Sequence, residues 1–105
     1  MNLTHTRSED VEAGSVVYFM SGSIDGASSD RFHDIITGYQ PDKFSSLNID
    51  LQDVDFVSSA GLRAFVKIIR WCKELEVSFW VSNANAAVWN VFELAQILSK
   101  RAQAE

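Results

Sequence analysis

Residues 53–63 have the sequence DVDFVSSAGLR, which joins the end of a predicted strand directly to the first turn of a predicted amphipathic helix. The hydroxyls of Ser58 and Ser59 therefore stand at a helix N-terminus. Free backbone N–H groups and the positive end of the helix dipole favour negative charge there, so such a place can hold a phosphate. Two interpretations follow from the residues alone: a serine here is either a plain helix cap or a regulatory switch.

The sequence on either side of this segment predicts a strand–helix–strand unit. Residues 47–52 and 77–82 alternate apolar and polar side chains, which is typical of strands with one buried face. A helix is expected between them, over about residues 59–75. The side chains expected on its buried side are those of Leu62, Phe65, Val66, Ile69 and Cys72. Two strands joined through a helix by short connections form a βαβ unit, in which the strands are expected to be parallel and the crossover right-handed. The one-sided alternation of both strands favours helices mainly on one face of the sheet.

Two further strands and two further helices are predicted outside this unit. An edge strand over about residues 2–8 precedes a strand over 15–21, whose β-branched and aromatic residues are typical of sheets. The segment 21–26 is rich in serine and glycine and is predicted to be a loop. A first helix is expected over about 28–38, because its apolar residues recur at helical spacing, and a last helix begins near Asn85.

Together these elements predict an α/β fold class, with a mixed, mostly parallel sheet of about four strands and helices mainly on one face. The chain is expected to be a single domain over residues 1–105, with a tail at 99–105. The residues expected to point inward from the last helix are Val88, Val91, Phe92 and Ala95. Trp71, Trp80 and Trp89 either pack over the sheet or serve as exposed interface anchors.

Composition narrows the class of protein. The formal net charge of −5 argues against nucleic-acid binding. The single cysteine excludes an internal disulfide, and no apolar run approaches the ~20 residues that span a bilayer, so a cytoplasmic protein without membrane contact is expected. His5 and His33 have no metal-ligand spacing with Cys72, and no phosphate-binding glycine motif is present. We therefore expect no metal, no cofactor and no catalytic residues, and the protein is predicted not to be an enzyme.

Three segments resemble one known family: SGSID at 21–25, NIDL at 48–51 and FVSSAGLR at 56–63. They are similar to the STAS domain of bacterial anti-sigma factor antagonists, and the order of the predicted elements agrees over about residues 3–95. The resemblance implies a STAS-like fold and a phosphorylation switch. In that family a serine at the head of this helix is phosphorylated by a partner kinase that is also an anti-sigma factor.

Ser59 occupies the position that matches the phosphorylated serine, and Ser58 is the second candidate. The family often has aspartate where this chain has Ser58, and serine or threonine where it has Ala60. The loop that carries Asp25 is expected to reach the same sheet edge as Ser59, and Asp25 is either an Asx-turn residue or a contact for the kinase. The residues expected to contact the partner are Ser23, Asp25, Ser58, Ser59, Ala60, Gly61 and Arg63.

The function that the resemblance implies is that of an anti-sigma factor antagonist. The unphosphorylated protein would bind an anti-sigma factor that is also a serine/threonine protein kinase, and thereby release a sigma factor or a similar client. A serine phosphatase would reset the switch. The alternative is a constitutive STAS subunit of a larger signalling or lipid-transport assembly.

Overall fold

Strand β3 (Ser46–Val57) lies inside the sheet and pairs with one strand on each side. The structure, a computed structural model, describes residues 2–94. β2 (Ser15–Ile24) and β4 (Ser78–Ser82) both run parallel to β3, and β1 (Thr4–Asp10) is antiparallel to β2 at the edge. The sheet is therefore mixed and mostly parallel, with the order β1-β2-β3-β4, which confirms the predicted fold class.

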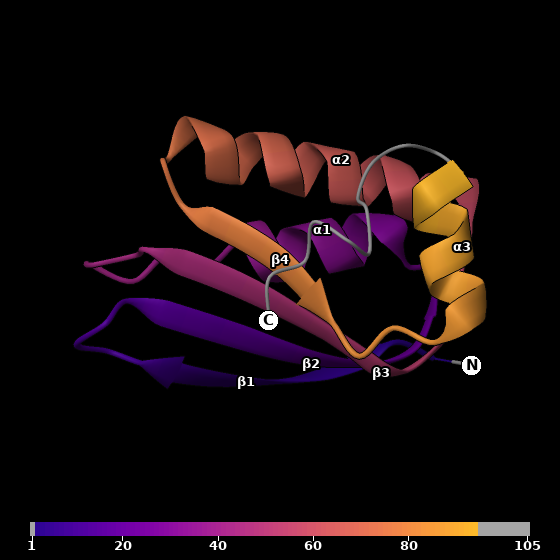
Figure 1. Cartoon of the computed structure of the whole chain (residues 1–105), viewed down its shortest axis with the longest axis horizontal. Coiled ribbons are helices and arrows are strands. Elements are labelled where there is room, and N and C mark those ends of the chain that lie inside the picture. The colour runs from indigo at the N-terminus through magenta and orange to yellow at the C-terminus, as the bar shows by residue number, and fades with distance from the viewer. Residues whose placement is uncertain (1, 95–105) are drawn as a thin grey trace.

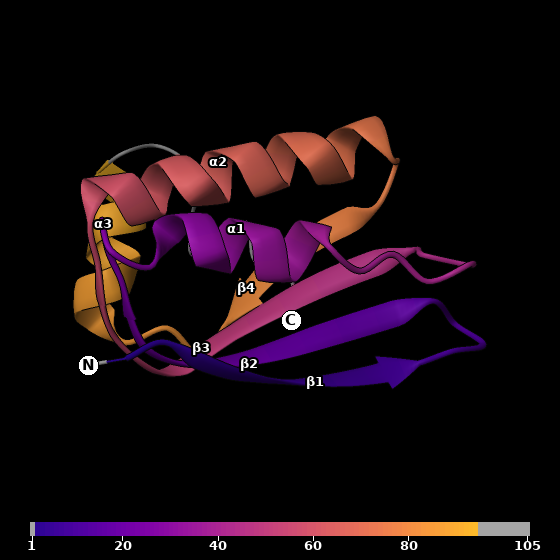
Figure 2. The ribbon, with the colours of Figure 1, turned by 180° about the vertical axis from the view of Figure 1, so that it is seen from behind.

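Three helices connect and cover these strands. α1 (Ser29–Thr37) and α2 (Ser59–Glu74) lie on the same face of the sheet, and α3 (Ala86–Leu94) stands at one end of it (Figures 1 and 2). Within residues 2–94 no helix covers the opposite face, so the predicted one-sided arrangement is confirmed. Because α2 connects the parallel neighbours β3 and β4, these three elements form the predicted strand–helix–strand crossover.

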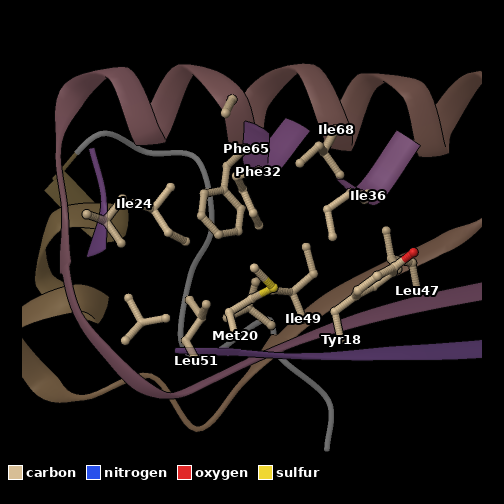
Figure 3. Packing of buried hydrophobic residues seen from close by; sticks show 14 of the residues in the cluster. Tyr18, Met20, Ile24, Phe32, Ile36, Leu47, Ile49, Leu51, Phe65 and Ile68 are labelled. Carbon is tan, nitrogen blue, oxygen red and sulfur yellow. The ribbon is translucent and has the colours of Figure 1, made fainter. Parts of the chain in front are cut away.

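Aromatic side chains join the three helices inside the core. The ring centroid of Phe65 in α2 lies 4.9 Å from that of Phe32 in α1 and 5.0 Å from that of Phe92 in α3. All three side chains are fully buried. Figure 3 shows Phe32 and Phe65 between α2 and the sheet residues Met20 and Ile49. Since buried aromatic rings remove large apolar areas from water, Phe65 is the central contact of the helical layer.

Two strands are longer than the sequence predicts. The predicted loop at 21–26 is wrong over residues 21–24, because β2 continues through Ile24, and β3 extends beyond the alternating segment 47–52 to Val57. The two strands stay paired as far as Ile24 and Val57, with two register shifts, so pairing overrides the local turn propensity of serine and glycine. A Cβ on Gly22 would lie 2.3 Å from the Asn2 carbonyl oxygen, so this glycine allows a close approach of two backbones.

The buried face of α2 differs from the predicted one. The predicted inward residues Leu62, Val66 and Ile69 are only half-buried. The buried residues of the helix are Gly61, Ala64, Phe65, Ile68 and Cys72, of which only Phe65 and Cys72 were predicted. The helix therefore turns two small residues inward, and at Gly61 the missing side chain lets the first turn pack close against the backbone of β2.

The predicted inward face of α3 is confirmed in the part that the structure describes. Val88 and Phe92 are buried, and Val91 is half-buried. Ala95, which was expected on the same face, and the predicted tail at 99–105 lie outside the described residues.

Two of the three tryptophans are packed into the domain, namely Trp71 and Trp89. Trp89 is only 7% exposed, and its ring meets that of Phe92 at 5.9 Å in an edge-to-face arrangement. The ring of the half-buried Trp71 lies 5.6 Å from that of Phe44, and Trp80 is half-buried in β4. The interpretation of Trp89 as an exposed interface anchor is therefore wrong, and the packing alternative holds.

Replacing Phe65 by alanine removes the aromatic contact that α1, α2 and α3 share. We expect Phe65→Ala to lower the free energy of unfolding by about 3–5 kcal/mol, measured by urea denaturation. Phe56→Ala is the matched control, because it makes the same chemical change at a side chain that is 53% exposed. The control should change the free energy by about 0.5 kcal/mol or less. Equal losses in the two variants would contradict the central role of Phe65.

Candidate functional site

The end of β2 and the start of α2 meet at the carboxyl edge of the sheet. The backbone N–H of Ser58 donates a hydrogen bond to the carbonyl oxygen of Ile24 at 2.9 Å, and Ile24 pairs with Val57. Figure 2 shows the connection from β2 to α1 and the connection from β3 to α2 running side by side. The two loops therefore reach the same edge, as predicted, which brings Asp25 and the two serines into one region.

Ser58 is the N-cap of α2. Its backbone is extended (φ −88°, ψ 178°), and its hydroxyl oxygen accepts a hydrogen bond from the Gly61 N–H at 3.2 Å. Its carbonyl oxygen accepts from the Leu62 N–H at 2.9 Å, which begins the helical hydrogen-bond ladder. The side chain satisfies one of the free N–H groups of the first turn, so Ser58 caps the helix; its phosphorylation stays a prediction.

Ser59 has different surroundings from Ser58. It is the first residue of α2 and is exposed, whereas Ser58 is half-buried. Helical spacing places Ser59 on the same outward side as Arg63 and Lys67, which are also exposed. A phosphate on Ser59 would lie outside the core and next to the N–H groups of the first turn, which favour negative charge.

Asp25 organises the loop between β2 and α1. One of its carboxylate oxygens accepts hydrogen bonds from the backbone N–H groups of Ala27 (3.0 Å) and Ser28 (3.2 Å). The Ser28 hydroxyl donates to the carbonyl oxygen of Ser23 at 2.8 Å, which closes the loop. These bonds form an Asx turn, one of the two predicted alternatives for Asp25. Contact of this half-buried carboxylate with a kinase stays a prediction.

Ser23 and Gly61 lie beneath the surface of this edge. Ser23 is 8% exposed, and its hydroxyl donates a hydrogen bond to Asp55 Oδ1 at 2.9 Å, which joins β2 to β3. A Cβ on Gly61 would lie 2.3 Å from the Ile24 carbonyl oxygen, so only glycine lets α2 sit this close to β2. Both residues support the shape of the edge, and contact of either with a partner stays a prediction.

A small hollow of about 130 Å³ lies between α1 and α2 beside this edge. Its lining includes Asp30 and His33 of α1 and Ala60, Arg63 and Lys67 of α2. Of the predicted contact residues, Ser59 and Arg63 are exposed, Asp25, Ser58 and Ala60 are half-buried, and Ser23 and Gly61 are buried. The lining carries two permanent cations against one carboxylate.

Phe56 is a surface residue of this edge that the sequence analysis missed. It is 53% exposed at the end of β3, next to the exposed Asp55. Alternation continued from Leu47, Ile49 and Leu51 places Phe56 on the outward side of β3, so the sequence did carry a signal for its exposure. The two register shifts in the pairing of β2 with β3 leave Val54 and Val57 both buried, while Phe56 between them stays exposed. Exposed aromatic side chains are frequent anchors of protein interfaces.

Other chemistry is limited in the part of the chain that the structure describes. Residues 2–94 contain no group of three or more His, Cys, Asp or Glu side chains that could hold a metal ion. Burial raises the pKa of the Cys72 thiol to about 11, so this thiol is protonated at neutral pH and is a poor nucleophile. None of the helices within those residues has the length and apolar character needed to cross a membrane.

The geometry defines a class of protein: a small α/β domain with an exposed serine at a strand-to-helix junction on the carboxyl edge of its sheet. The chain belongs to the STAS domain family, whose match covers residues 4–101. This confirms the resemblance found in the sequence. No curated protein sequence matches the chain.

Solved structures share the fold. The unphosphorylated anti-sigma factor antagonist SpoIIAA is similar with a TM-score of 0.71 and 15% identity, over 90% of this chain and 82% of that one. An anti-sigma factor antagonist from Mycobacterium paratuberculosis has a TM-score of 0.71 and 23% identity, over 90% and 81% of the two chains. The STAS domain of a SulP transporter from Vibrio cholerae has a TM-score of 0.62 and 22% identity, over 79% and 63%. The same fold therefore occurs in antagonists and in transporters.

The two adjacent serines should respond differently to the same substitution. We expect Ser58→Ala to lower the free energy of unfolding by about 1 kcal/mol, because it removes the hydrogen bond from the hydroxyl oxygen to the Gly61 N–H. Ser59→Ala is the matched control and should change the free energy by about 0.5 kcal/mol or less. Urea denaturation measures both. A larger loss in Ser59→Ala than in Ser58→Ala would contradict the assignment of the cap.

Gly61 and Gly26 provide a second matched pair. A Cβ on Gly61 would meet the Ile24 carbonyl oxygen at 2.3 Å, whereas a Cβ on Gly26 meets nothing within 4 Å. We expect Gly61→Ala to cost about 1–3 kcal/mol in the free energy of unfolding, although alanine favours helix more than glycine does. Gly26→Ala should be neutral within about 0.5 kcal/mol. A stabilised Gly61→Ala variant, measured by thermal unfolding, would show that the contact is not tight.

Proposed function

We propose that this protein is an anti-sigma factor antagonist whose binding is switched by phosphorylation of Ser59. In its unphosphorylated form it binds an anti-sigma factor that is also a serine/threonine protein kinase, and a sigma factor or a similar client is released. The phosphorylated form does not bind, and a serine phosphatase restores it. The exchange takes place in the cytoplasm, and neither nucleic acid nor a membrane is a partner.

The observation that carries this proposal is the difference between the two serines. The hydroxyl oxygen of Ser58 accepts a hydrogen bond from the Gly61 N–H at 3.2 Å, and Ser59 is exposed at the first helical position. In a kinase reaction the hydroxyl oxygen attacks the γ-phosphorus of ATP, ADP leaves, and the hydroxyl proton is released. Ser59 meets this requirement without loss of the cap, and the protein is the substrate rather than the enzyme.

The surface around Ser59 offers an apolar anchor within a charged rim. Phe56 is 53% exposed and lies on the same edge, and Asp25 and Arg63 supply charges of opposite sign. Interfaces of this kind have an aromatic centre and a polar rim. A docking surface that covers Phe56 would reach Ser59 because both residues flank the junction of β3 and α2.

Phosphorylation would change the charge of this surface more than its shape. A phosphate adds about −1.5 to −2 charges at neutral pH, near the carboxylates of Asp25 and Asp55. Like charges brought together at an interface cost several kcal/mol, whereas a micromolar complex is held by only about 8 kcal/mol. The added charge is therefore sufficient to end binding without unfolding the domain.

A second candidate function is that of a constitutive STAS subunit in a larger signalling or lipid-transport assembly. The similarity to the STAS domain of a SulP transporter favours this alternative. In that case the edge around Phe56 would be a permanent docking surface. Size-exclusion chromatography of an extract of the native cells distinguishes the two, because a stable high-mass complex that forms equally well with Ser59→Ala supports the second candidate.

Mass spectrometry of the protein isolated from its own cells tests the switch. We expect phosphate on Ser59 in the wild type and in Ser58→Ala, and none in Ser59→Ala, because Ser58 serves as the cap. Phosphate on Ser58 alone would contradict the assignment.

Binding to the partner kinase tests the consequence of the charge. We expect Ser59→Asp to weaken binding at least about tenfold, which corresponds to about 1.4 kcal/mol, while Ser59→Ala binds as the wild type does. Ser78→Asp is the matched control, since Ser78 is exposed at the start of β4, far from the carboxyl edge. Isothermal titration calorimetry measures the affinities, and equal losses in the two aspartate variants would indicate a general effect of charge.

A further inference from the structure

Helix α2 carries a row of cations on an acidic protein. Arg63, Lys67 and Arg70 recur at i, i+4 and i+7 and are all exposed, so they share the outward side of the helix; we call them the cationic row. The whole chain has a net charge of −5, so this side of α2 differs in sign from the rest of the molecule. Ser59 lies one helical turn before Arg63, at the N-terminal end of the row.

Arg63 is well placed to meet a phosphate on Ser59. Side chains at i and i+4 of a helix have Cβ atoms about 5–6 Å apart, and an anion that precedes a cation at this spacing stabilises the helix. Arg63 has no ion-pair partner within residues 2–94, so its guanidinium is available. Lys67 is eight residues from Ser59, about 12 Å along the helix axis, and is too distant for a direct contact.

The neighbouring helix adds little opposing charge. Across the hollow of about 130 Å³, Arg63 and Lys67 are accompanied by Asp30 and His33 of α1. The His33 ring already pairs with Asp34 at 3.3 Å. The other charged groups at this edge are the carboxylates of Asp25, in the loop before α1, and Asp55, near the end of β3. The lining of the hollow therefore has two cations and one carboxylate, that of Asp30, so its net charge is positive on the side near Ser59.

From this geometry we infer that Arg63 binds the phosphate of phosphorylated Ser59, and that this pairing withdraws Arg63 from the partner's surface. The inference rests on the proposed function for its second half. A planar guanidinium donates two parallel hydrogen bonds to phosphate oxygens, which a lysine ammonium does not. Phosphorylation then acts twice at one place: it adds a dianion to the docking edge, and it neutralises the cation that an acidic partner surface would contact.

The pairing is tested on the full chain with phosphoserine incorporated at position 59 during translation, so that no kinase is needed. The pH dependence of the ³¹P chemical shift reports the second ionisation of the phosphate. Arg63 favours the dianion and lowers its pKa, so the titration midpoint should lie at higher pH in Arg63→Gln than in the wild type. Arg70→Gln is the matched control, since it removes the same charge from the same row farther from Ser59.

We expect the titration midpoint of Arg70→Gln to equal that of the wild type. Circular dichroism should show the same fold in all three proteins. His33 is present in each of the three proteins, so any effect of its ring on the phosphate is the same in all of them. Identical midpoints in all three proteins would overturn the pairing. An equal rise of the titration midpoint in both variants would overturn the pairing as well, because that result would report an effect of overall charge rather than a contact with Arg63.

The second half of the inference is tested with unphosphorylated protein and the anti-sigma factor kinase. We expect Arg63→Gln to bind about fivefold more weakly than the wild type, and Arg70→Gln to bind within about twofold of it. Equal affinities of the wild type and Arg63→Gln would show that Arg63 does not contribute to partner binding, and would overturn the second half of the inference. The proposed function fails separately, if protein from its own cells carries no phosphate on Ser59, and that result leaves the ³¹P comparison unaffected.

Discussion

The close contact between the end of β2 and the first turn of α2 is the constraint on which the candidate site depends. The Ile24 carbonyl oxygen accepts the Ser58 N–H at 2.9 Å, and a Cβ on Gly61 would lie 2.3 Å from the same oxygen. With α2 held against β2 in this way, the Ser58 side chain turns inward to cap the helix. Ser59, the next residue, is the first residue of the helix and lies on the surface.

Much of the fold could be predicted because its strands alternate polar and apolar residues and its helices have apolar residues at helical spacing. The alternation at 47–52 and 77–82 is sufficient for two parallel strands and the crossover between them. What periodicity cannot supply is the effect of pairing and close packing. The segment 21–24 has the composition of a turn and is nevertheless a strand, because β3 lies alongside it. The inward face of α2 includes Gly61 and Ala64, and a search for large apolar residues overlooks both.

The candidate site was predictable in position but not in detail. A pair of serines at a helix start could be located from the sequence, but the residues alone could not tell which serine makes the cap. That difference depends on backbone angles and on the direction of one hydrogen bond. Phe56 was missed for another reason: it lies on the outward side that the alternation of β3 gives, but its apolar side chain is typical of buried positions. Sequence patterns locate such an edge, and three-dimensional contacts decide which side chains it presents.

A modification on Ser59 must act through the surface of the domain rather than through its core. The core is held by Phe65 and its neighbours on three helices, all out of contact with water, and the cap of α2 uses Ser58. A phosphate outside these contacts adds charge where free N–H groups tolerate it, so the folded state persists. The same rigid edge suits a permanent docking domain equally well. Under the proposed switch, a STAS domain would need no change of fold to pass between constitutive and switched binding, because the modified hydroxyl and the cation one turn away both lie on its surface.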